Sequence, residues 1–166
     1  MADQADALLA LYDQVLPEVY GYVLRRCSGR AQAEDLTAEV FLAAASAVRR
    51  GTVPDLTPAW LIGVARHKLV DHWRRQARDE RVLQAVAEVA PDEDDWTEAL
   101  DEGPALAALS QLGAHHRAAL TLRHLDGLPV AEVAEHLGRT LHATEALLVR
   151  ARVALRRAYH QGGDRG

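Results

Sequence analysis

The stretch Leu125-Asp-Gly-Leu-Pro-Val-Ala-Glu-Val-Ala-Glu-His-Leu-Gly-Arg-Thr-Leu141 predicts two helices joined by a tight turn. Pro129 opens the first helix, whose apolar residues recur at three- and four-residue steps. Gly138 supplies a left-handed turn residue, and the second helix begins after it with Leu141, Thr144 and Leu148 facing inward. A short helix, a glycine turn and a longer helix are typical of a DNA-binding helix-turn-helix, but also of an ordinary helical hairpin.

Arginines that follow this stretch favour DNA binding. Arg150, Arg152, Arg156 and Arg157 would place positive charge beside the surface that faces DNA, although such a run is also typical of a solvated helix face. The surrounding sequence predicts further helices over residues 105–112, 115–125 and 141–159.

A second basic segment begins at Thr57–Pro58, where Thr57 is a suitable N-cap and Pro58 a suitable first-turn residue. The predicted helix continues to at least Arg78. Its basic residues alternate with Trp60 and Trp73, a combination that suits opened DNA because cations hold phosphates and aromatic rings stack on bases. We expect Trp60 to lie in the core and Trp73 to be exposed among the arginines.

The remaining N-terminal sequence predicts two more helices. One covers residues 5–27, and Pro17 should kink it or split it in two. The other covers residues 32–49 and stops at Gly51. No stretch alternates apolar and polar residues for long enough to predict a sheet, so the expected fold class is all-α.

Charge is distributed unevenly along the 166 residues, whose net charge is −5. Residues 1–78 carry 10 basic and 9 acidic side chains, and residues 105–166 carry 8 basic and 5 acidic ones. The segment between them carries 1 basic and 10 acidic side chains. The overall charge argues against a nucleic-acid partner, but the two flanks are mildly basic and each could contact phosphate.

These patterns predict two small helical domains, residues 5–80 and 105–160, joined by a flexible acidic linker over residues 81–104. Trp96 is a candidate anchor within the linker. Residues 161–166 should form a disordered tail.

Several classes of protein are excluded by what the sequence lacks. Cys27 is the single cysteine, so no intramolecular disulfide can form. The apolar runs are too short to cross a membrane and no secretion signal precedes them, which predicts a cytoplasmic protein without membrane insertion. No His-Glu-x-x-His motif, glycine-rich phosphate loop or nucleophile elbow is present, so we expect no enzyme activity, metal or cofactor.

Three motifs together resemble a known family. They are Ala33-Glu-Asp-Leu-Thr-Ala-Glu-Val-Phe-Leu42, Ala59-Trp-Leu-Ile-Gly-Val-Ala-Arg66 with its basic continuation, and Leu122-Arg-His-Leu-Asp-Gly-Leu-Pro-Val-Ala-Glu-Val-Ala-Glu-His-Leu-Gly138. In this order and spacing they resemble the extracytoplasmic-function sigma factors of bacterial RNA polymerase, over roughly residues 8–160.

The resemblance implies a transcription initiation factor with two DNA-contacting domains and two protein partners, core RNA polymerase and an anti-sigma factor. The residues that match the polymerase-binding helix are Asp35, Leu36, Glu39 and Phe41. The residues that fall on the helix for the minus-ten promoter element, taken with the basic and aromatic pattern, are Arg66, His67, Lys68, Asp71, Trp73, Arg74, Arg75 and Arg78. His67 stands where the family often has Asn.

The recognition helix departs from the family pattern. Aligned on Arg150-Ala-Arg152, the chain lacks two cations and has Glu145 in their neighbourhood, and a carboxylate there could accept a hydrogen bond from a cytosine amino group. The candidates for the minus-thirty-five element are Arg139, His142, Thr144, Glu145, Arg150 and Arg152. An alternative interpretation is a helix-turn-helix regulator with a sensory or partner-binding helical domain, which leaves the basic helix at 58–78 unexplained.

Overall fold

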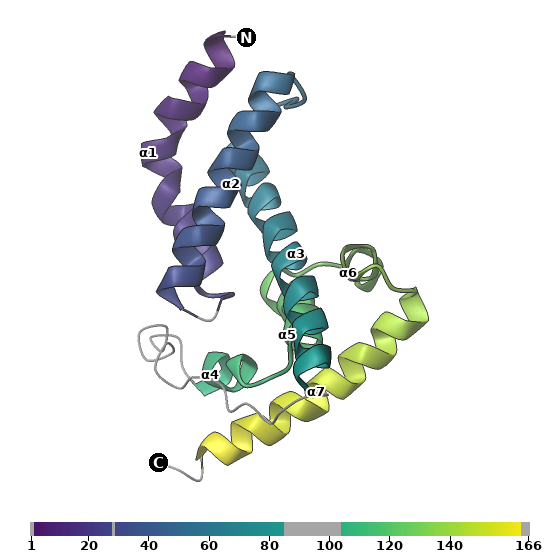
Figure 1. The fold of residues 1–166 in the computed structure, drawn as a ribbon. Helices are drawn as coiled ribbons and strands as arrows, with labels where there is room; N and C mark the ends of the chain where they lie inside the picture. The colour runs from purple at the N-terminus through teal and green to yellow at the C-terminus, as the bar shows by residue number, and fades with distance from the viewer. Residues whose placement is uncertain (1, 28, 85–103, 164–166) are drawn as a thin grey trace. The chain divides into compact units, whose positions relative to one another are not determined.

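The computed structural model describes residues 2–27, 29–84 and 104–163, and every regular element in these ranges is a helix (Figure 1). The chain divides into two compact units, Met1–Leu69 and Val70–Gly166. The prediction of an all-α fold is confirmed. Trp96 and most of the predicted acidic linker lie outside the described residues.

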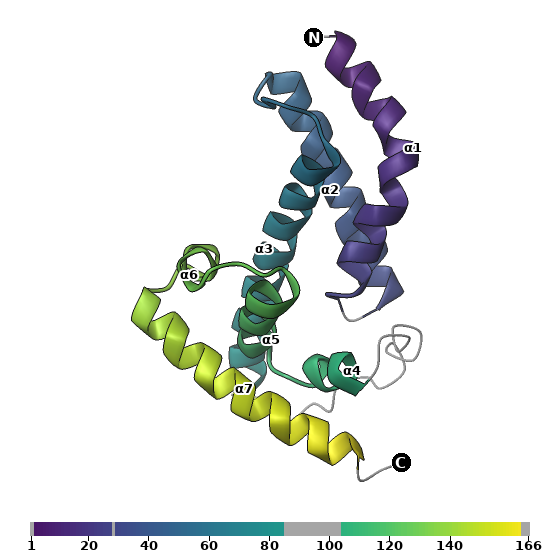
Figure 2. The ribbon, with the colours of Figure 1, turned by 180° about the vertical axis from the view of Figure 1, so that it is seen from behind.

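Two long helices build most of the first unit. The helices α1 (Ala2–Leu24) and α2 (Arg30–Arg50) lie side by side, as both views of the ribbon show (Figures 1 and 2). Val15, Val19 and Val23 of α1 are buried at four-residue steps, and Val40 and Ala44 are buried on α2. These β-branched and small side chains form one apolar seam between the helices.

Pro17 lies inside α1, which continues through it as a single helix. The prediction that Pro17 could split the helix is therefore wrong. Pro17 and Asp13 are both exposed. Water can reach the Asp13 carbonyl that loses its helical hydrogen bond at proline, so the cost of proline is reduced at this position.

The third helix, α3 (Pro58–Gln84), begins where the sequence predicts it. The backbone N–H of Trp60 donates a hydrogen bond to Thr57 Oγ1 at 3.1 Å, which confirms Thr57 as the N-cap. A row of buried side chains follows the helix at four-residue steps: Leu61, Ala65, Leu69, Trp73 and Ala77, none more than 3% exposed.

The second unit is built on the longest helix of the C-terminal part, α7 (Leu141–Gly163). The helices α4 (Pro104–Ser110), α5 (Ala114–Leu120) and α6 (Val130–Leu137) each pack against it. Its buried residues include Leu147, Leu148 and Ala151. The helix continues through Gly163, so it covers the first residues of the predicted disordered tail.

Left-handed glycines end two helices, as predicted. Gly51 ends α2 with φ 68°, and Gly138 ends α6 with φ 63°. The backbone N–H of Arg139 donates to the Ala134 carbonyl at 3.0 Å. This hydrogen bond satisfies a carbonyl near the C-terminal end of α6. The turn between α6 and α7 is thereby held by its own backbone.

One segment differs from the predicted plain helix over residues 115–125. After α5 the chain forms a π-helical turn, η3 (Thr121–Leu125), in which the Asp126 N–H donates to the Thr121 carbonyl at 3.0 Å. Arg123 Nη1 donates to the Leu128 carbonyl at 3.1 Å and holds the following loop. Local propensity does not distinguish such a wide turn from an α-helix.

Cys27 lies just beyond α1. It is 1% exposed, and its Sγ–H donates to the Val23 carbonyl at 3.0 Å. Within the described ranges, no helix combines the length and apolar character needed to cross a membrane.

Candidate functional site

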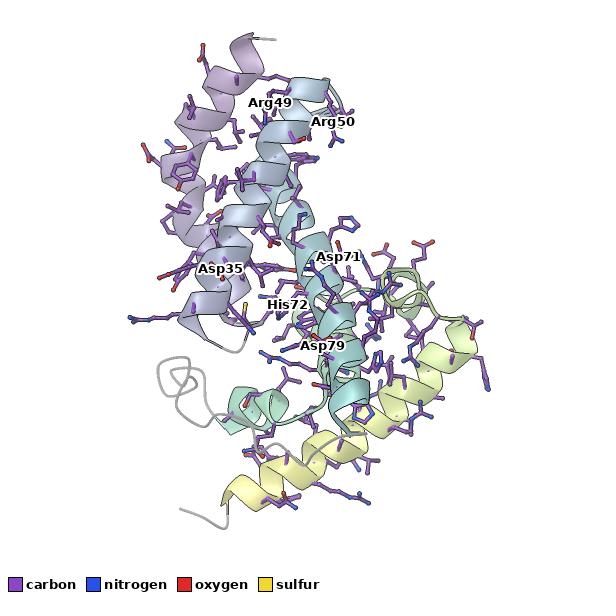
Figure 3. All side chains as sticks on the ribbon, viewed as in Figure 1. Asp35, Arg49, Arg50, Asp71, His72 and Asp79 are labelled. Carbon is purple, nitrogen blue, oxygen red and sulfur yellow. The ribbon has the colours of Figure 1, made fainter. Side chains whose placement is uncertain are left out.

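The predicted partner-binding residues of α2 lie in two environments. Asp35 and Glu39 are exposed, and Figure 3 shows Asp35 on α2. Leu36 is 5% exposed and lies one turn before Val40 on the buried seam, so it packs in the core, and its contact with a partner stays a prediction. Phe41 is half-buried and remains accessible on one side.

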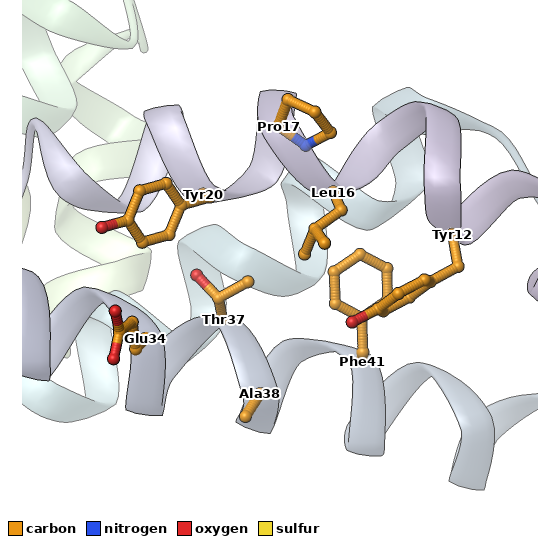
Figure 4. A pocket seen from close by; sticks show the side chains of 8 residues that line it. All are labelled: Tyr12, Leu16, Pro17, Tyr20, Glu34, Thr37, Ala38 and Phe41. Atoms are coloured by element: carbon orange, nitrogen blue, oxygen red, sulfur yellow. The ribbon is translucent and has the colours of Figure 1, made fainter.

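An apolar groove of about 470 Å³ lies between α1 and α2 beside these residues (Figure 4). The rings of Tyr12 and Phe41 meet edge to face across it, with centroids 4.7 Å apart. The other side chains that line it are Leu16, Pro17, Tyr20, Glu34, Thr37 and Ala38. Phe41 thus lines the groove, and its contact with a partner stays a prediction.

Acidic side chains lie on both helices that form the groove. Glu34 lines it, and Asp35 and Glu39 are exposed on the same helix. Asp13 and Glu18 are exposed on α1. An apolar groove lined by one carboxylate, on helices that expose others, suits a partner that offers both apolar side chains and cations.

The basic residues of α3 are mostly accessible. His67, Asp71, Arg74, Arg75 and Arg78 are exposed, and Figure 3 shows Asp71 on this helix. Arg66 and Lys68 are half-buried. Four-residue steps connect Asp71, Arg75 and Asp79, all exposed, so one side of the helix faces away from the core.

The tryptophans of α3 are placed the opposite way from the prediction. Trp73 is 2% exposed, whereas Trp60 is only half-buried. Trp73 lies on the buried row that continues from Leu61 and Leu69, while Trp60 is one position off that row. A buried indole cannot stack on a base, so the structure contradicts the expectation that Trp73 is exposed to DNA.

On the helix-turn-helix, the predicted DNA-contacting residues differ in how exposed their side chains are. His142, Glu145, Arg150 and Arg152 are exposed, and Arg139 is half-buried. Thr144 is fully buried, with Oγ1 donating to the Thr140 carbonyl at 2.8 Å. Its burial fits the prediction that Thr144 faces inward, and its contact with bases stays a prediction. Leu141, expected to face inward, is 50% exposed.

Two histidines that the sequence did not single out lie next to the arginines of this unit. Burial lowers the pKa of His116 on α5, and Arg150 and Arg139 lower it further by charge repulsion. Burial also lowers the pKa of His124, with smaller effects of Arg152 and Arg123. At both histidines, burial and neighbouring arginines act in the same direction and disfavour the protonated imidazole.

No group of three or more His, Cys, Asp or Glu side chains among the described residues is arranged to hold a metal ion.

Comparisons with known proteins match the two parts of the chain to two family models. Residues 11–79 match the family described as Sigma-70 region 2, and residues 103–155 match Sigma-70, region 4. The chain is 36% identical over 156 residues to the ECF RNA polymerase sigma factor BldN of Streptomyces coelicolor, covering 90% of this chain and 59% of that protein. It is 34% identical over 142 residues to the ECF RNA polymerase sigma factor SigL of Mycobacterium tuberculosis, covering 82% of this chain and 80% of that protein.

A solved structure shares the fold. The sigma factor RpoE of Bartonella quintana, determined in complex with the anti-sigma factor NepR, is similar with a TM-score of 0.55. The similarity covers 95% of this chain and 97% of the other at 22% sequence identity.

Proposed function

We propose, on the premise that this chain belongs to the extracytoplasmic-function sigma factors of the sigma-70 family, that it binds core RNA polymerase and directs it to specific promoters. The observation that carries the proposal is the order of the two matched regions, residues 11–79 and then 103–155, on one chain. Each region carries exposed arginines suited to phosphate. The chain spans 59% of the length of BldN. The proposal therefore also relies on the exposed residues of this chain.

Each part of the chain is proposed to have its own role, according to the residues that it exposes. Residues 5–80 would form the part that binds polymerase through α2 and opens the minus-ten element with the exposed basic residues of α3. Residues 105–160 would form the part that contacts the minus-thirty-five element through α7. Residues 81–104 would connect the two, which lets them act at separate promoter elements.

The polymerase-binding surface combines Asp35 and Glu39 with the neighbouring apolar groove. Exposed carboxylates attract a basic partner and set its orientation, while the groove supplies apolar area at Tyr12 and Phe41. An anti-sigma partner is also proposed, because a structurally similar sigma factor is found in complex with one. Binding to core polymerase places the chain in the cytoplasm, and no catalytic step is assigned to it.

Run-off transcription tests the function directly. The purified chain, added to core polymerase on a library of bacterial promoter fragments, should produce promoter-specific transcripts that core polymerase alone does not make. Absence of every such transcript would exclude the sigma-factor function. A helix-turn-helix regulator with a sensory domain is the alternative, and it would bind DNA without co-purifying with core polymerase.

Glu145 is expected to contribute to promoter choice. Its carboxylate is exposed in the second turn of α7, where the family pattern lacks an acidic residue. Replacing Glu145 with alanine should weaken discrimination at one base pair of the upstream element by about 1 to 3 kcal/mol, since one base-specific hydrogen bond is lost. The measurement is sequence selection of upstream elements by the reconstituted holoenzyme.

Glu135→Ala is the matched control for this experiment. Glu135 is also exposed but lies on α6, before the turn. Selected sequences that are identical for Glu145→Ala, Glu135→Ala and the unmodified chain would show that Glu145 reads no base.

A further inference from the structure

The groove between α1 and α2 has two chemically different ends. The two helices run antiparallel (Figures 1 and 2), so residues late in α1 lie opposite residues early in α2. Figure 4 shows Tyr20 and Glu34 towards one end of the groove and Tyr12 and Phe41 towards the other. Phe41 follows Glu34 by seven positions on α2. At the rise of an α-helix this places the two ends roughly 10 Å apart.

The apolar end is an open aromatic corner. The rings of Tyr12 and Phe41 meet edge to face at 69°, and Leu16 lines the groove at the same end (Figure 4). Tyr12 is 39% exposed and Phe41 is half-buried, so part of this apolar surface is in contact with water. Covering it would be favourable, and an aromatic ligand ring could add a further edge-to-face or offset contact to the pair.

The polar end contains a buried hydroxyl group whose hydrogen-bonding capacity is unused. Thr37 lines the groove but is only 5% exposed, and its Oγ1 has no hydrogen-bond partner within the part of the chain that the structure describes. Figure 4 shows this oxygen on the side of Thr37 that faces Tyr20 and α1. A buried hydroxyl without a partner costs free energy, and a hydrogen-bond donor on a ligand would offset that cost.

The polar end also determines the charge of the ligand. Among the described residues that line the groove, Glu34 is the one charged side chain, and it is exposed one turn before Thr37 on α2. A carboxylate accepts hydrogen bonds and attracts a cation, while it repels an anion. A primary ammonium group carries three donors, so it can serve the Glu34 carboxylate and Thr37 Oγ1 at the same time.

We propose that the α1–α2 groove binds a small amphiphilic amine. Glu34 and Thr37 Oγ1 hold its ammonium group, and its apolar tail, roughly 10 Å long, covers the Tyr12–Phe41 pair. The volume of about 470 Å³ lies within the range of about 300 to 1,000 Å³ that is usual for small-molecule sites. The site belongs entirely to the first unit, so the inference goes beyond the proposed function and does not rest on it.

The test is an NMR titration of the isotope-labelled full chain with phenylbutylamine, whose ring and ammonium group are separated by a chain that spans the groove. Residues that line the groove should shift with saturation, with half-saturation at about 1 mM or below. Phenylbutyrate keeps the ring and chain but carries a carboxylate, and butylamine keeps the ammonium group but lacks the ring. Each should bind about tenfold more weakly than phenylbutylamine, or weaker still.

Four variants assign the binding to named groups. Glu34→Gln should weaken phenylbutylamine binding about fivefold to tenfold, whereas Glu18→Gln, which neutralises an exposed carboxylate of α1 outside the groove lining, should leave it unchanged. Thr37→Val keeps the shape of the side chain and removes only the unpaired hydroxyl, so the fold should survive while binding weakens about threefold to tenfold. Ala38→Leu adds volume at an exposed lining position and should block the groove.

Phenylbutylamine that causes no saturable shift in the groove would overturn the proposal, as would phenylbutyrate that binds equally well. Equal weakening by Glu34→Gln and Glu18→Gln would overturn it too. Groove residues that shift when the chain alone is diluted would show that a second copy of the chain occupies the groove, which also overturns the amine site. Run-off transcription is measured without amine, so the failure of either proposal leaves the other standing.

Discussion

Replacing Trp73 with alanine is expected to lower the free energy of unfolding by about 3 to 5 kcal/mol. Trp73 is 2% exposed and is the largest fully buried side chain among the described residues. Alanine would remove most of its packing contacts and leave a cavity beside Leu69 and Ala77 on the same helix row. Urea denaturation followed by far-ultraviolet circular dichroism measures the change.

Two variants serve as controls for Trp73→Ala. Trp60→Ala removes the same chemical group from a half-buried position, so its effect should be clearly smaller. Trp73→Phe should be milder than Trp73→Ala, because it keeps an aromatic ring and removes a buried indole N–H that has no hydrogen-bond partner. A loss for Trp73→Ala no larger than that for Trp60→Ala would contradict the core role and return Trp73 to the candidate DNA contacts.

Reversing the two exposed carboxylates of α2 is expected to weaken core polymerase binding about 100-fold. The double variant Asp35→Arg with Glu39→Arg would place like charges against a basic partner surface, which costs several kcal/mol at an interface. Both side chains are exposed, so the fold should survive the change. Titration calorimetry with purified core polymerase measures the affinity.

The control for this prediction is a charge reversal of equal size elsewhere in the same unit. Asp6 and Asp55 are both exposed and lie away from the middle of α2. The variant Asp6→Arg with Asp55→Arg carries the same net charge and should bind with nearly unchanged affinity. Equal weakening in both double variants would mean that net charge, not the α2 surface, governs binding.

Helix boundaries were the most predictable part of the fold, because residues with restricted or unusual backbone geometry mark them. Thr57 and Pro58 open α3, and Gly51 and Gly138 end helices in the left-handed conformation. The π-turn at Thr121–Leu125 was not predictable, since the i to i+5 hydrogen bond depends on how the segment packs. The outcome at Pro17, a helix that continues without a split, depends on exposure, which propensity does not supply.

The candidate site was predictable where it consists of exposed charges on one helix. Asp35, Glu39, Arg74 and Arg75 needed only helical spacing to be placed on the surface. The burial of Trp73 was not expected, although the sequence carries a signal for it. Trp73 continues the four-residue row of Leu61, Ala65 and Leu69. Neighbouring arginines suggested exposure, but on a helix adjacent residues point about 100° apart and say little about one another's environment.

Features that join two helices could not be predicted from one sequence. The groove requires Tyr12 and Phe41, which are far apart along the chain, to meet across α1 and α2. The lowered pKa of His116 on α5, to which Arg150 of α7 contributes after burial, likewise requires α5 to pack on α7. Periodicity identifies the face of each helix but leaves the pairing and register of faces undetermined.

The burial of Cys27 makes the chain's single thiol a reporter of native-state opening. At 1% exposure, with its Sγ–H bonded to the Val23 carbonyl, the thiol can react with a disulfide reagent only when the segment after α1 opens transiently. The ratio of its reaction rate to that of a free thiol then gives the equilibrium constant of that opening.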